Sequence, residues 1–238
     1  MVAMRLFLLL LWDSIGFVDT QPIMGRQMNE TTQAKLILHH APRTRSIRCR
    51  WLLEEMGVPH TLAQALYRAT PEETSAYLEL HPLAKIPALE HGDTTMFESV
   101  AIMQYILANF EPSEFEVRPG ETDYGRFLQW MHFGEGGMTL PVTMLLAHTA
   151  LLPEGHRNVG IAAWAKDETD KHLKALEQSG IAHDTYLVAD RFTAADISVG
   201  YMLYLLKIIR QFGDAPDSVK AYFRRITSRD AWKKASAD

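Results

Sequence analysis

The chain has 238 residues, of which 47% are hydrophobic and 22% are charged, as in an ordinary globular protein of one or two domains. Its formal net charge of −5 argues against a nucleic-acid-binding protein, which would present a basic face. The single cysteine excludes an internal disulfide and any Cys-x-x-Cys redox or zinc motif, and it fits a cytoplasmic protein in a reducing compartment.

The start of the chain differs from the rest, and we expect residues 1–33 to be a disordered extension. The apolar run from Leu6 to Trp12 is far too short to cross a bilayer, which takes about 20 residues. No small-x-small cleavage site follows it, so a signal peptide is the weaker interpretation, with Met24 or Met28 as an alternative start. The apolar run 197–209 is interrupted and also too short, so we expect no membrane partner.

Residues 34–110 alternate between strand and helix patterns. Between residues 44 and 56 the apolar positions fall on one helical face, and Gly57 followed by Pro59 ends that helix. Thr70-Pro71 is typical of a helix start. The expected elements are a strand at 35–40, a helix at 44–56, an alternating strand at 60–66, a helix at 70–80, a hairpin of strands at 88–90 and 95–97, and a helix at 98–110.

The second half of the chain has a different pattern. Residues 111–122 are rich in Pro, Glu and Gly and are predicted to be a linker. The patterns beyond it are helical only, at about 123–150, 158–180, 193–212 and 216–228. The sequence therefore predicts an α+β chain of two domains, with an α/β domain at 34–110 and an all-helical domain at 123–238.

The most informative stretch is Lys85-Ile86-Pro87-Ala88-Leu89, which is followed by Glu98-Ser99. Pro87 biases Ile86 toward an extended backbone and belongs at the start of a strand. An X-Pro bond is also where a cis peptide costs little, and a cis bond would turn the backbone polar groups of Ile86 toward an extended peptide. Glu98-Ser99 opens a helix and offers a hydroxyl and N–H groups to a carboxylate. These residues predict a site for a small anionic peptide.

In this arrangement the chain resembles the cytosolic glutathione transferases, over about residues 34–235. The family pattern Asn-Pro-x-Gly-Lys-Val/Ile-Pro-x-Leu corresponds to residues 81–89, and the Glu/Asp-Ser pair of the family corresponds to Glu98-Ser99. Residues 192–197 match the internal capping box of the family, and residues 44–55 resemble its bacterial Ser/Thr-type branch. Two positions depart from the first pattern, namely His81 for Asn and Ala84 for Gly.

The resemblance implies a thioredoxin-like domain at 34–110 that binds glutathione as a co-substrate, and a helical domain that holds a small hydrophobic electrophile. It also implies a homodimer, in which Met96-Phe97 and the helix after them contact the partner. The glutathione-binding residues that it implies are Lys85, Ile86, Pro87, Glu98 and Ser99.

Two hydroxyls are candidates for the group that activates the glutathione sulfur. Thr44 occupies the position where relatives carry a catalytic Ser or Tyr, and Ser46 is the alternative. Either residue is also a common helix cap, which is the purely structural interpretation. A hydroxyl donor, the positive end of the helix dipole and the charges of Arg43, Arg45 and Arg48 would all favour a thiolate over a thiol.

Other residues near this site are predicted to be structural. Cys49 lies on the apolar face of its helix, where a cysteine behaves as a small hydrophobe rather than as a nucleophile. His40 is expected at the surface, with a place in the lining of the pocket as the alternative, and Arg48 is expected to be exposed or ion-paired. Thr193 and Asp196 are predicted to cap the helix that they open.

The function that we expect is a glutathione transferase, which activates the glutathione thiolate for attack on small hydrophobic electrophiles. Two alternatives stay open. One is a glutathione-dependent isomerase, dehalogenase or ether-cleaving relative, and the other is a transferase-like binding module without turnover. The peptide-binding residues are all present, which a pure scaffold would not need, and this favours an enzyme. Resemblance in fold does not name the electrophile.

Overall fold

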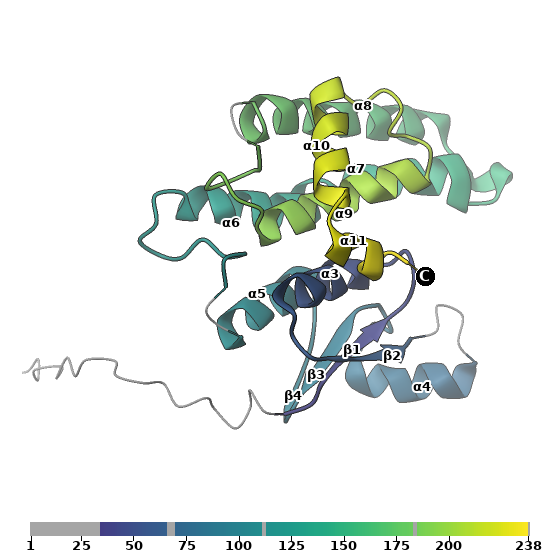
Figure 1. Ribbon diagram of the computed structural model, residues 1–238. Helices are drawn as coiled ribbons and strands as arrows, with labels where there is room; N and C mark the ends of the chain where they lie inside the picture. The colour runs from purple at the N-terminus through teal and green to yellow at the C-terminus, as the bar shows by residue number, and fades with distance from the viewer. Residues whose placement is uncertain (1–33, 66–69, 111–112, 183–184, 238) are drawn as a thin grey trace, which may run out of the picture. The chain divides into compact units, whose positions relative to one another are not determined.

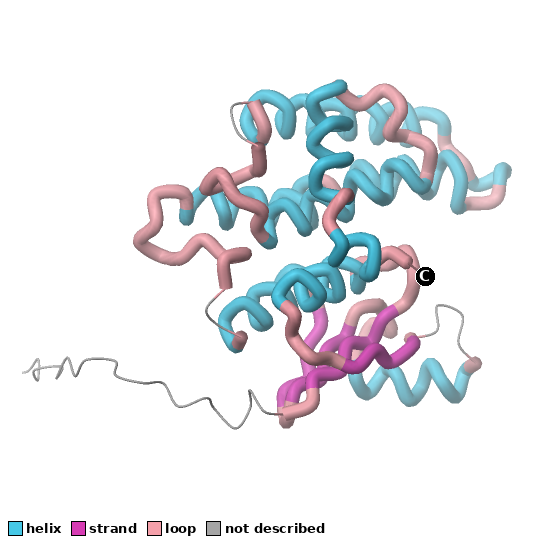
Figure 2. The backbone as a smooth tube through the Cα atoms, in the orientation of Figure 1, coloured by secondary structure: helices cyan, strands magenta, loops and turns pink. Residues whose placement is uncertain are grey.

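The computed structural model describes residues 34–65, 70–110, 113–182 and 185–237, and Figure 1 labels its elements. The predictions for residues 1–33 and for the linker residues 111 and 112 lie outside the described residues. Figure 2 shows the strands together in the first part of the chain and helices and loops in the second. Beyond residue 110, the described residues form no strand, and their β-pairing is limited to an isolated bridge between Val188 and Arg191.

A mixed four-stranded sheet forms the centre of the first part, in the order β2-β1-β3-β4. β1 pairs parallel with β2 and antiparallel with β3, and β3 forms a hairpin with β4. This order makes the domain thioredoxin-like, as predicted. The strands are β1 (Leu36–His40), β2 (Thr61–Gln64), β3 (Ala88–His91) and β4 (Thr94–Phe97).

The strand β2 does not have the predicted alternation. It lies at the edge of the sheet, and its side chains are exposed except for the half-buried Ala63. An edge strand pairs on one side only, so its burial depends on what packs over it rather than on its own sequence pattern.

Helices cover both faces of this sheet. Figure 1 shows α3 (Ser46–Met56) and α5 (Ser99–Asn109) over one face and α4 (Pro71–Leu80) under the other. α3 contacts β1, α5 and two helices of the second part, so it is buried on most of its circumference. It ends at Gly57, whose φ of 63° is the left-handed conformation that the sequence predicts for a helix C-cap.

The second part is helical, as predicted, and its long first helix is interrupted by π-helical turns. α11 is not predicted, because six residues are too few to show a helical period. Among the described residues, no helix is long and apolar enough to cross a membrane. The elements are α6 (Tyr124–His132), η1 (Phe133–Gly137), α7 (Thr139–Leu146), η2 (Ala147–Leu151), η3 (Glu154–His156), α8 (Val159–Ala175), η4 (Leu176–Gly180), α9 (Ala194–Ile208), α10 (Asp217–Thr227) and α11 (Asp230–Ala235).

Trp51 of α3 joins the two parts through an aromatic cluster. Its ring centroid lies 4.6 Å from that of Trp232 on α11 and 5.6 Å from that of Phe192. Gly200 of α9 lies directly beneath it, and a Cβ there would come within 3.1 Å of the indole ring and 2.7 Å of Ile226. The absence of a side chain at Gly200 therefore allows α9 to approach α3 closely.

The predicted capping box at the start of α9 is confirmed. Asp196 is fully buried and accepts hydrogen bonds from the backbone N–H of Thr193 at 2.8 Å and from its hydroxyl at 3.2 Å. It also accepts from the backbone N–H of Leu187 at 3.1 Å and from the hydroxyl of Tyr222 at 2.8 Å. Burial raises the pKa of Asp196 to about 6, whereas the hydrogen bonds from these donors act to lower it.

We expect Asp196→Ala to destabilise the protein by more than an ordinary cap would. The change leaves three buried donor residues without their acceptor, and each unsatisfied donor costs about 1–3 kcal/mol. The free energy of unfolding should therefore fall by about 3 kcal/mol or more, measured by urea denaturation at pH 7. The exposed Asp214→Ala is the matched control and should change it by less than about 0.5 kcal/mol. Equal effects of the two substitutions would contradict the assignment.

Candidate functional site

Three segments meet at one end of the sheet. Because β1 and β3 are antiparallel with His39 opposite Ala88, the loop 41–45 after β1 lies near Pro87, which precedes β3. β4 ends opposite Ala88, so Glu98 and the start of α5 belong to the same end. The N-termini of α3 and α5 thus lie at the end of the sheet where the sequence predicts the peptide site.

The predicted glutathione-binding residues differ in exposure. Lys85 and Glu98 are exposed, Ile86 is half-buried, and Pro87 and Ser99 are buried. The Ile86–Pro87 peptide bond is cis. Glu98 has a φ of 74°, in the left-handed region that favours glycine, where it turns the chain from β4 into α5. Such backbone strain is concentrated at functional sites in proteins.

Ser99 is the first residue of α5, which begins one residue later than predicted, and its hydroxyl already has a partner. The residue is only 2% exposed, and its Oγ accepts a hydrogen bond from Nη1 of Arg48 at 3.2 Å. A guanidinium can only donate, so the hydroxyl hydrogen of Ser99 remains available for another acceptor. No local sequence signal predicts this pair, because the two residues are 51 positions apart.

Arg48 connects four chain segments from the centre of the protein. It is fully buried, forms an ion pair with Glu135 of η1, and donates through Nη2 to the carbonyl oxygen of Gly134 at 3.1 Å. Its Nε and Nη2 also donate to the carbonyl oxygen of Ser198, both at 3.2 Å. A Cβ on Gly134 would lie 2.5 Å from that oxygen, so a glycine is required there. Of the two predicted alternatives for Arg48, the structure therefore confirms the ion pair and not the exposed position.

Glu135 holds a second arginine as well. Nε of Arg45 lies 2.9 Å from both carboxylate oxygens of Glu135, and its Nη2 donates to Thr139 at 3.3 Å. Burial alone would raise the pKa of Glu135, but the charges of Arg48 and Arg45 outweigh it and lower the pKa. One carboxylate therefore offsets part of the positive charge of Arg45 and Arg48, which we expect from the sequence to lie beside the glutathione sulfur.

The two candidate hydroxyls are in direct contact. α3 begins at Ser46, two residues later than predicted, and the Oγ of Ser46 lies 2.7 Å from the Oγ1 of Thr44. Thr44 is half-buried and donates to the carbonyl oxygen of Ala41 at 2.8 Å. Ser46 has no exposed surface, and its Oγ lies 2.7 Å from the Nδ1 of His40.

His40 at the end of β1 and Cys49 within α3 are both buried. The prediction that His40 lies at the surface is wrong, since it is only 6% exposed. It is the last residue of β1, where the chain turns into α3, so the helix start covers its ring. Cys49 lies in the core, as predicted, and burial raises the pKa of its thiol to about 12. That thiol is protonated at neutral pH and is therefore a poor nucleophile.

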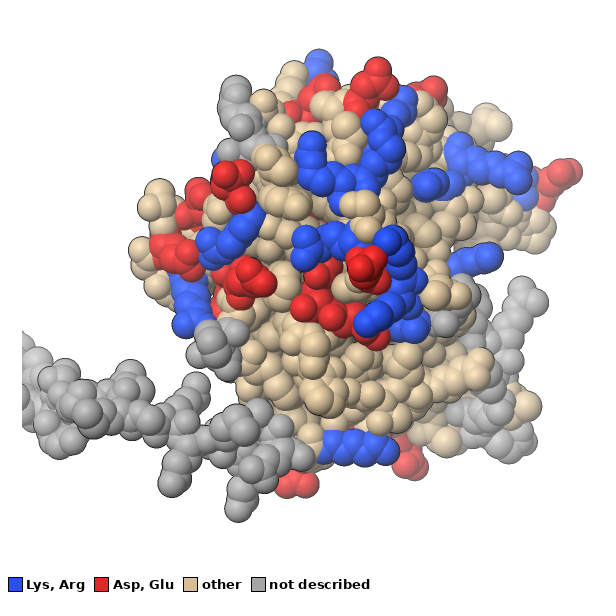
Figure 3. Space-filling view, in the orientation of Figure 1, with Lys and Arg blue, Asp and Glu red and all other residues tan. Residues whose placement is uncertain are grey.

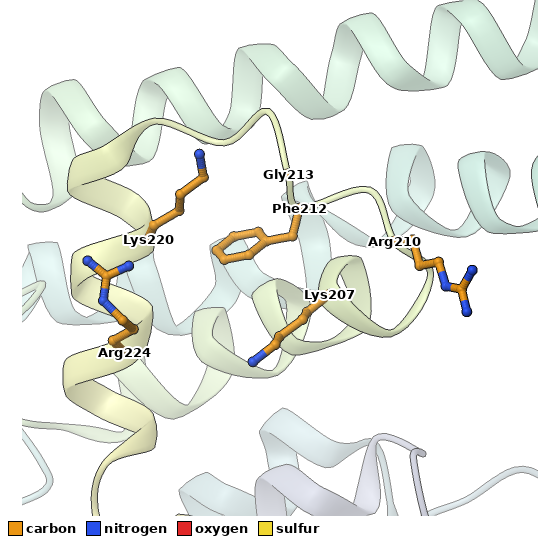
Figure 4. Close-up of a pocket in the computed structure, with 6 residues that line it drawn as sticks. All are labelled: Lys207, Arg210, Phe212, Gly213, Lys220 and Arg224. Carbon is orange, nitrogen blue, oxygen red and sulfur yellow. The ribbon is translucent and has the colours of Figure 1, made fainter.

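A separate basic hollow lies between α9 and α10 and shares no residue with this site. In Figure 4, the ring of Phe212 points toward α10, which carries Lys220 and Arg224, whereas the side chain of Arg210 points away. On the face shown in Figure 3, basic and acidic side chains are interspersed, in keeping with the slightly negative net charge. The hollow is lined by Lys207, Arg210, Phe212, Gly213, Lys220 and Arg224.

Comparison with known proteins agrees with this architecture. Residues 34–108 match the family described as glutathione S-transferase, N-terminal domain. Glutathione S-transferase 3 of Schizosaccharomyces pombe is 25% identical over 214 residues, which are 84% of this chain and 86% of that protein. Elongation factor 1-gamma of Prunus avium is 27% identical over 210 residues, and the match covers 84% of this chain but only 47% of that protein.

The fold of the described residues is that of the glutathione transferases. A crystal structure of a glutathione transferase from Phanerochaete chrysosporium, in complex with oxidised glutathione, superposes with a TM-score of 0.76 at 23% identity. The superposition covers 85% of this chain and 94% of that one. Residues 34–108 thus match the N-terminal domain of the glutathione S-transferases, and the chain has glutathione transferases among its homologues. The bacterial Ser/Thr-type branch stays a prediction, since the relatives named above are fungal and plant proteins.

We expect Glu135→Gln to destabilise the protein, because it leaves the buried charge of Arg48 without a counter-charge. Breaking a buried ion pair costs about 3–5 kcal/mol, so the free energy of unfolding at pH 7 should fall by roughly 3 kcal/mol in urea denaturation. Glu154→Gln, at an exposed position in η3, is the control and should have no measurable effect.

The effect of Glu135→Gln should also depend on pH. The pKa of Glu135 is lower in the folded than in the unfolded state, so its contribution is present above the ordinary glutamate pKa of ~4.3 and is lost as the pH falls through the folded-state pKa. The difference between Glu135→Gln and the wild type should therefore shrink below about pH 4. A difference that stays constant down to pH 3 would show that Glu135 does not act through its charge.

Proposed function

We propose that this protein is a glutathione transferase, which activates glutathione for attack on small hydrophobic electrophiles in the cytoplasm. The observation that carries the proposal is the meeting of three segments at one end of the sheet. They are the Thr44 loop at the start of α3, the Ile86–Pro87 turn before β3, and Glu98-Ser99 at the start of α5. A peptide with an acidic end and a thiol finds a partner for each of its parts there.

The residues present fit glutathione as a substrate. The half-buried Ile86 would pair its backbone with the extended tripeptide, and exposed Lys85 adds a positive charge beside it. The first N–H groups of α5 and the hydroxyl of Ser99 would receive a carboxylate, since helix N-termini favour anions. Arg48 supports this role, because its hydrogen bond to Ser99 keeps the hydroxyl oriented with its hydrogen free.

The chemistry requires a thiolate at neutral pH, whereas a free thiol titrates near ~8.5. Lowering this pKa by about two units takes roughly 2.7 kcal/mol in favour of the thiolate. Thr44 would donate its hydroxyl hydrogen to the sulfur, and the N-terminus of α3 would add its N–H groups and positive dipole. The thiol proton leaves to solvent. The sulfur then forms a bond to an electrophilic carbon, and the leaving group takes the displaced electron pair.

Thr44 is the better candidate for contact with the sulfur. It retains some exposed surface, whereas Ser46 has none and is enclosed by His40, Ala41 and Thr44. We therefore place Thr44 against the substrate and Ser46 behind it. The proposal includes a homodimer, in which the exposed Phe97 on the edge strand β4 is part of the contact with the partner.

Retention on immobilised glutathione and conjugation of an aromatic halide test this function together. We expect the protein to be retained, to be eluted by free glutathione, and to catalyse conjugation. Retention without conjugation would favour a specialised isomerase, dehalogenase or ether-cleaving enzyme. Failure to bind glutathione would favour a transferase-like binding module without turnover. The similarity to an elongation factor supports this alternative.

We expect Thr44→Ala to lower the rate of conjugation by about ten- to a hundredfold, the effect of losing roughly 1.4–2.7 kcal/mol of stabilisation. The bound thiol should titrate at a higher pH, followed by the ultraviolet absorbance of the thiolate, while glutathione affinity changes little. Thr44→Ser should keep or raise the activity, because serine rotates more freely. Thr95→Ala, at an exposed position of β4, is the control. An unchanged rate in Thr44→Ala would reject this hydroxyl.

A further inference from the structure

We infer that His40 is a positioning residue for the thiolate, through a directed chain of hydrogen bonds that runs from Arg50 through His40 and Ser46 to Thr44. The inference rests on the proposed function, and it assigns a role to a histidine that never contacts the substrate. The three steps of the chain follow from the distances and from which atoms are able to donate.

The first step is the tautomer that we assign to His40. Nη1 of Arg50 lies 3.3 Å from the Nε2 of His40. A guanidinium can only donate, so this contact is a hydrogen bond when Nε2 carries the lone pair. In a neutral imidazole the hydrogen then resides on Nδ1. Nδ1 lies 2.7 Å from the Oγ of Ser46, and with this tautomer His40 donates to the serine hydroxyl.

The second step fixes the direction of the Ser46 hydroxyl. Its oxygen accepts from His40 and also from the backbone N–H of Ala41, at 3.3 Å. A hydroxyl oxygen has two lone pairs and one hydrogen, so both acceptor positions are used. The hydrogen of Ser46 is left with two acceptors, namely the Oγ1 of Thr44 at 2.7 Å and the carbonyl oxygen of Ala41 at 3.2 Å. The shorter contact leads to Thr44.

In the third step, the hydroxyl of Thr44 is able to rotate and to donate its hydrogen to a different acceptor. Because Ser46 donates to Thr44, the threonine cannot donate back along the same contact. Without substrate its hydrogen goes to the carbonyl oxygen of Ala41 at 2.8 Å. A thiolate bound at the mouth of the loop offers a charged acceptor, and a hydrogen bond to a charged group is stronger than one to a carbonyl. The hydrogen of Thr44 would then rotate from Ala41 to the sulfur.

The chain therefore does two things for the thiolate. Each donor polarises the next, so the hydroxyl of Thr44 is a better donor than an isolated threonine. His40 also prevents the opposite arrangement, in which Ser46 accepts from Thr44 and removes the hydrogen that the sulfur needs. His40 ends β1 and Ser46 opens α3, so this contact ties together the two ends of the loop that carries Thr44.

The test compares two replacements of His40 in the full chain. Asparagine places an amide donor near the position of Nδ1 and should preserve the chain, whereas leucine removes it. We expect His40→Leu to lower kcat for conjugation by about three- to tenfold, the loss of one ordinary hydrogen bond, and to shift the titration of the bound thiol to higher pH. His40→Asn should restore most of both, and the dissociation constant of glutathione should stay within about twofold in each variant.

His91→Leu is the matched control, because His91 is a buried histidine of the same sheet at the opposite end of β1. It should affect stability but neither the thiol titration nor kcat. A His40→Leu protein with wild-type titration and rate would overturn the inference, and so would a His40→Asn protein as impaired as His40→Leu. If the wild type forms no thiolate and conjugates nothing, the proposed function fails, which is a distinct result.

A measurement without substitution covers the case in which His40→Leu does not fold. Nitrogen NMR of the wild-type imidazole should show Nδ1 protonated and Nε2 bare at neutral pH. The opposite tautomer would reverse the first step of the chain and would overturn the inference. Arg50→Met should weaken this preference, since it removes the donor to Nε2.

Discussion

The buried charge of Arg48 is the constraint on which the rest of this structure depends. An ion that is removed from water loses several kcal/mol of solvation free energy. This loss is offset only when all the hydrogens of the ion find acceptors inside the protein. Here the acceptors come from η1, from α9 and from the start of α5, so those segments must lie around α3 in one arrangement. Glu135 supplies the opposite charge, and Gly134 supplies the space. The position of the helical domain and the orientation of the Ser99 hydroxyl are thus set by the same side chain.

Most of the fold was predictable because its signals are local. Gly57 ends α3, Gly92-Asp93 turns the hairpin, and Thr193 with Asp196 caps α9, and each of these depends on neighbours within a few residues. The alternation predicted for the edge strand β2 was wrong, because the burial of its side chains is decided by distant parts of the chain. The short helix α11 was not predicted, because six residues show no helical period. The aromatic contact of Trp51 with Trp232 shows how distant parts of the chain meet, since 181 positions separate two rings whose centroids lie 4.6 Å apart.

The segments that meet at the candidate site were predictable, but the contacts between them were not. The motif around Pro87 and the pair Glu98-Ser99 name the segments, and the sheet register brings them to one end. The burial of His40 and Arg48 was not predictable, because a histidine or an arginine enters a core only when specific partners await it. Those partners lie on other elements, and one sequence carries no mark that pairs Arg48 with Glu135. The hydroxyls illustrate the same limit: Thr44 and Ser46 looked like alternatives, whereas the structure places them in one chain of contacts.

The burial of Cys49 has a consequence for how this protein meets oxidants. Its sulfur is fully enclosed between α3 and α5, 3.5 Å from the carbonyl oxygen of Ser99, and it is the only thiol in the chain. A mixed disulfide with oxidised glutathione needs an accessible thiolate on the protein, and this one is neither accessible nor ionised. The folded protein can therefore work among thiols and disulfides without being modified by them. Alkylation of Cys49 reports only the moments when α3 separates from α5, which makes the rate of that reaction a direct measure of local opening.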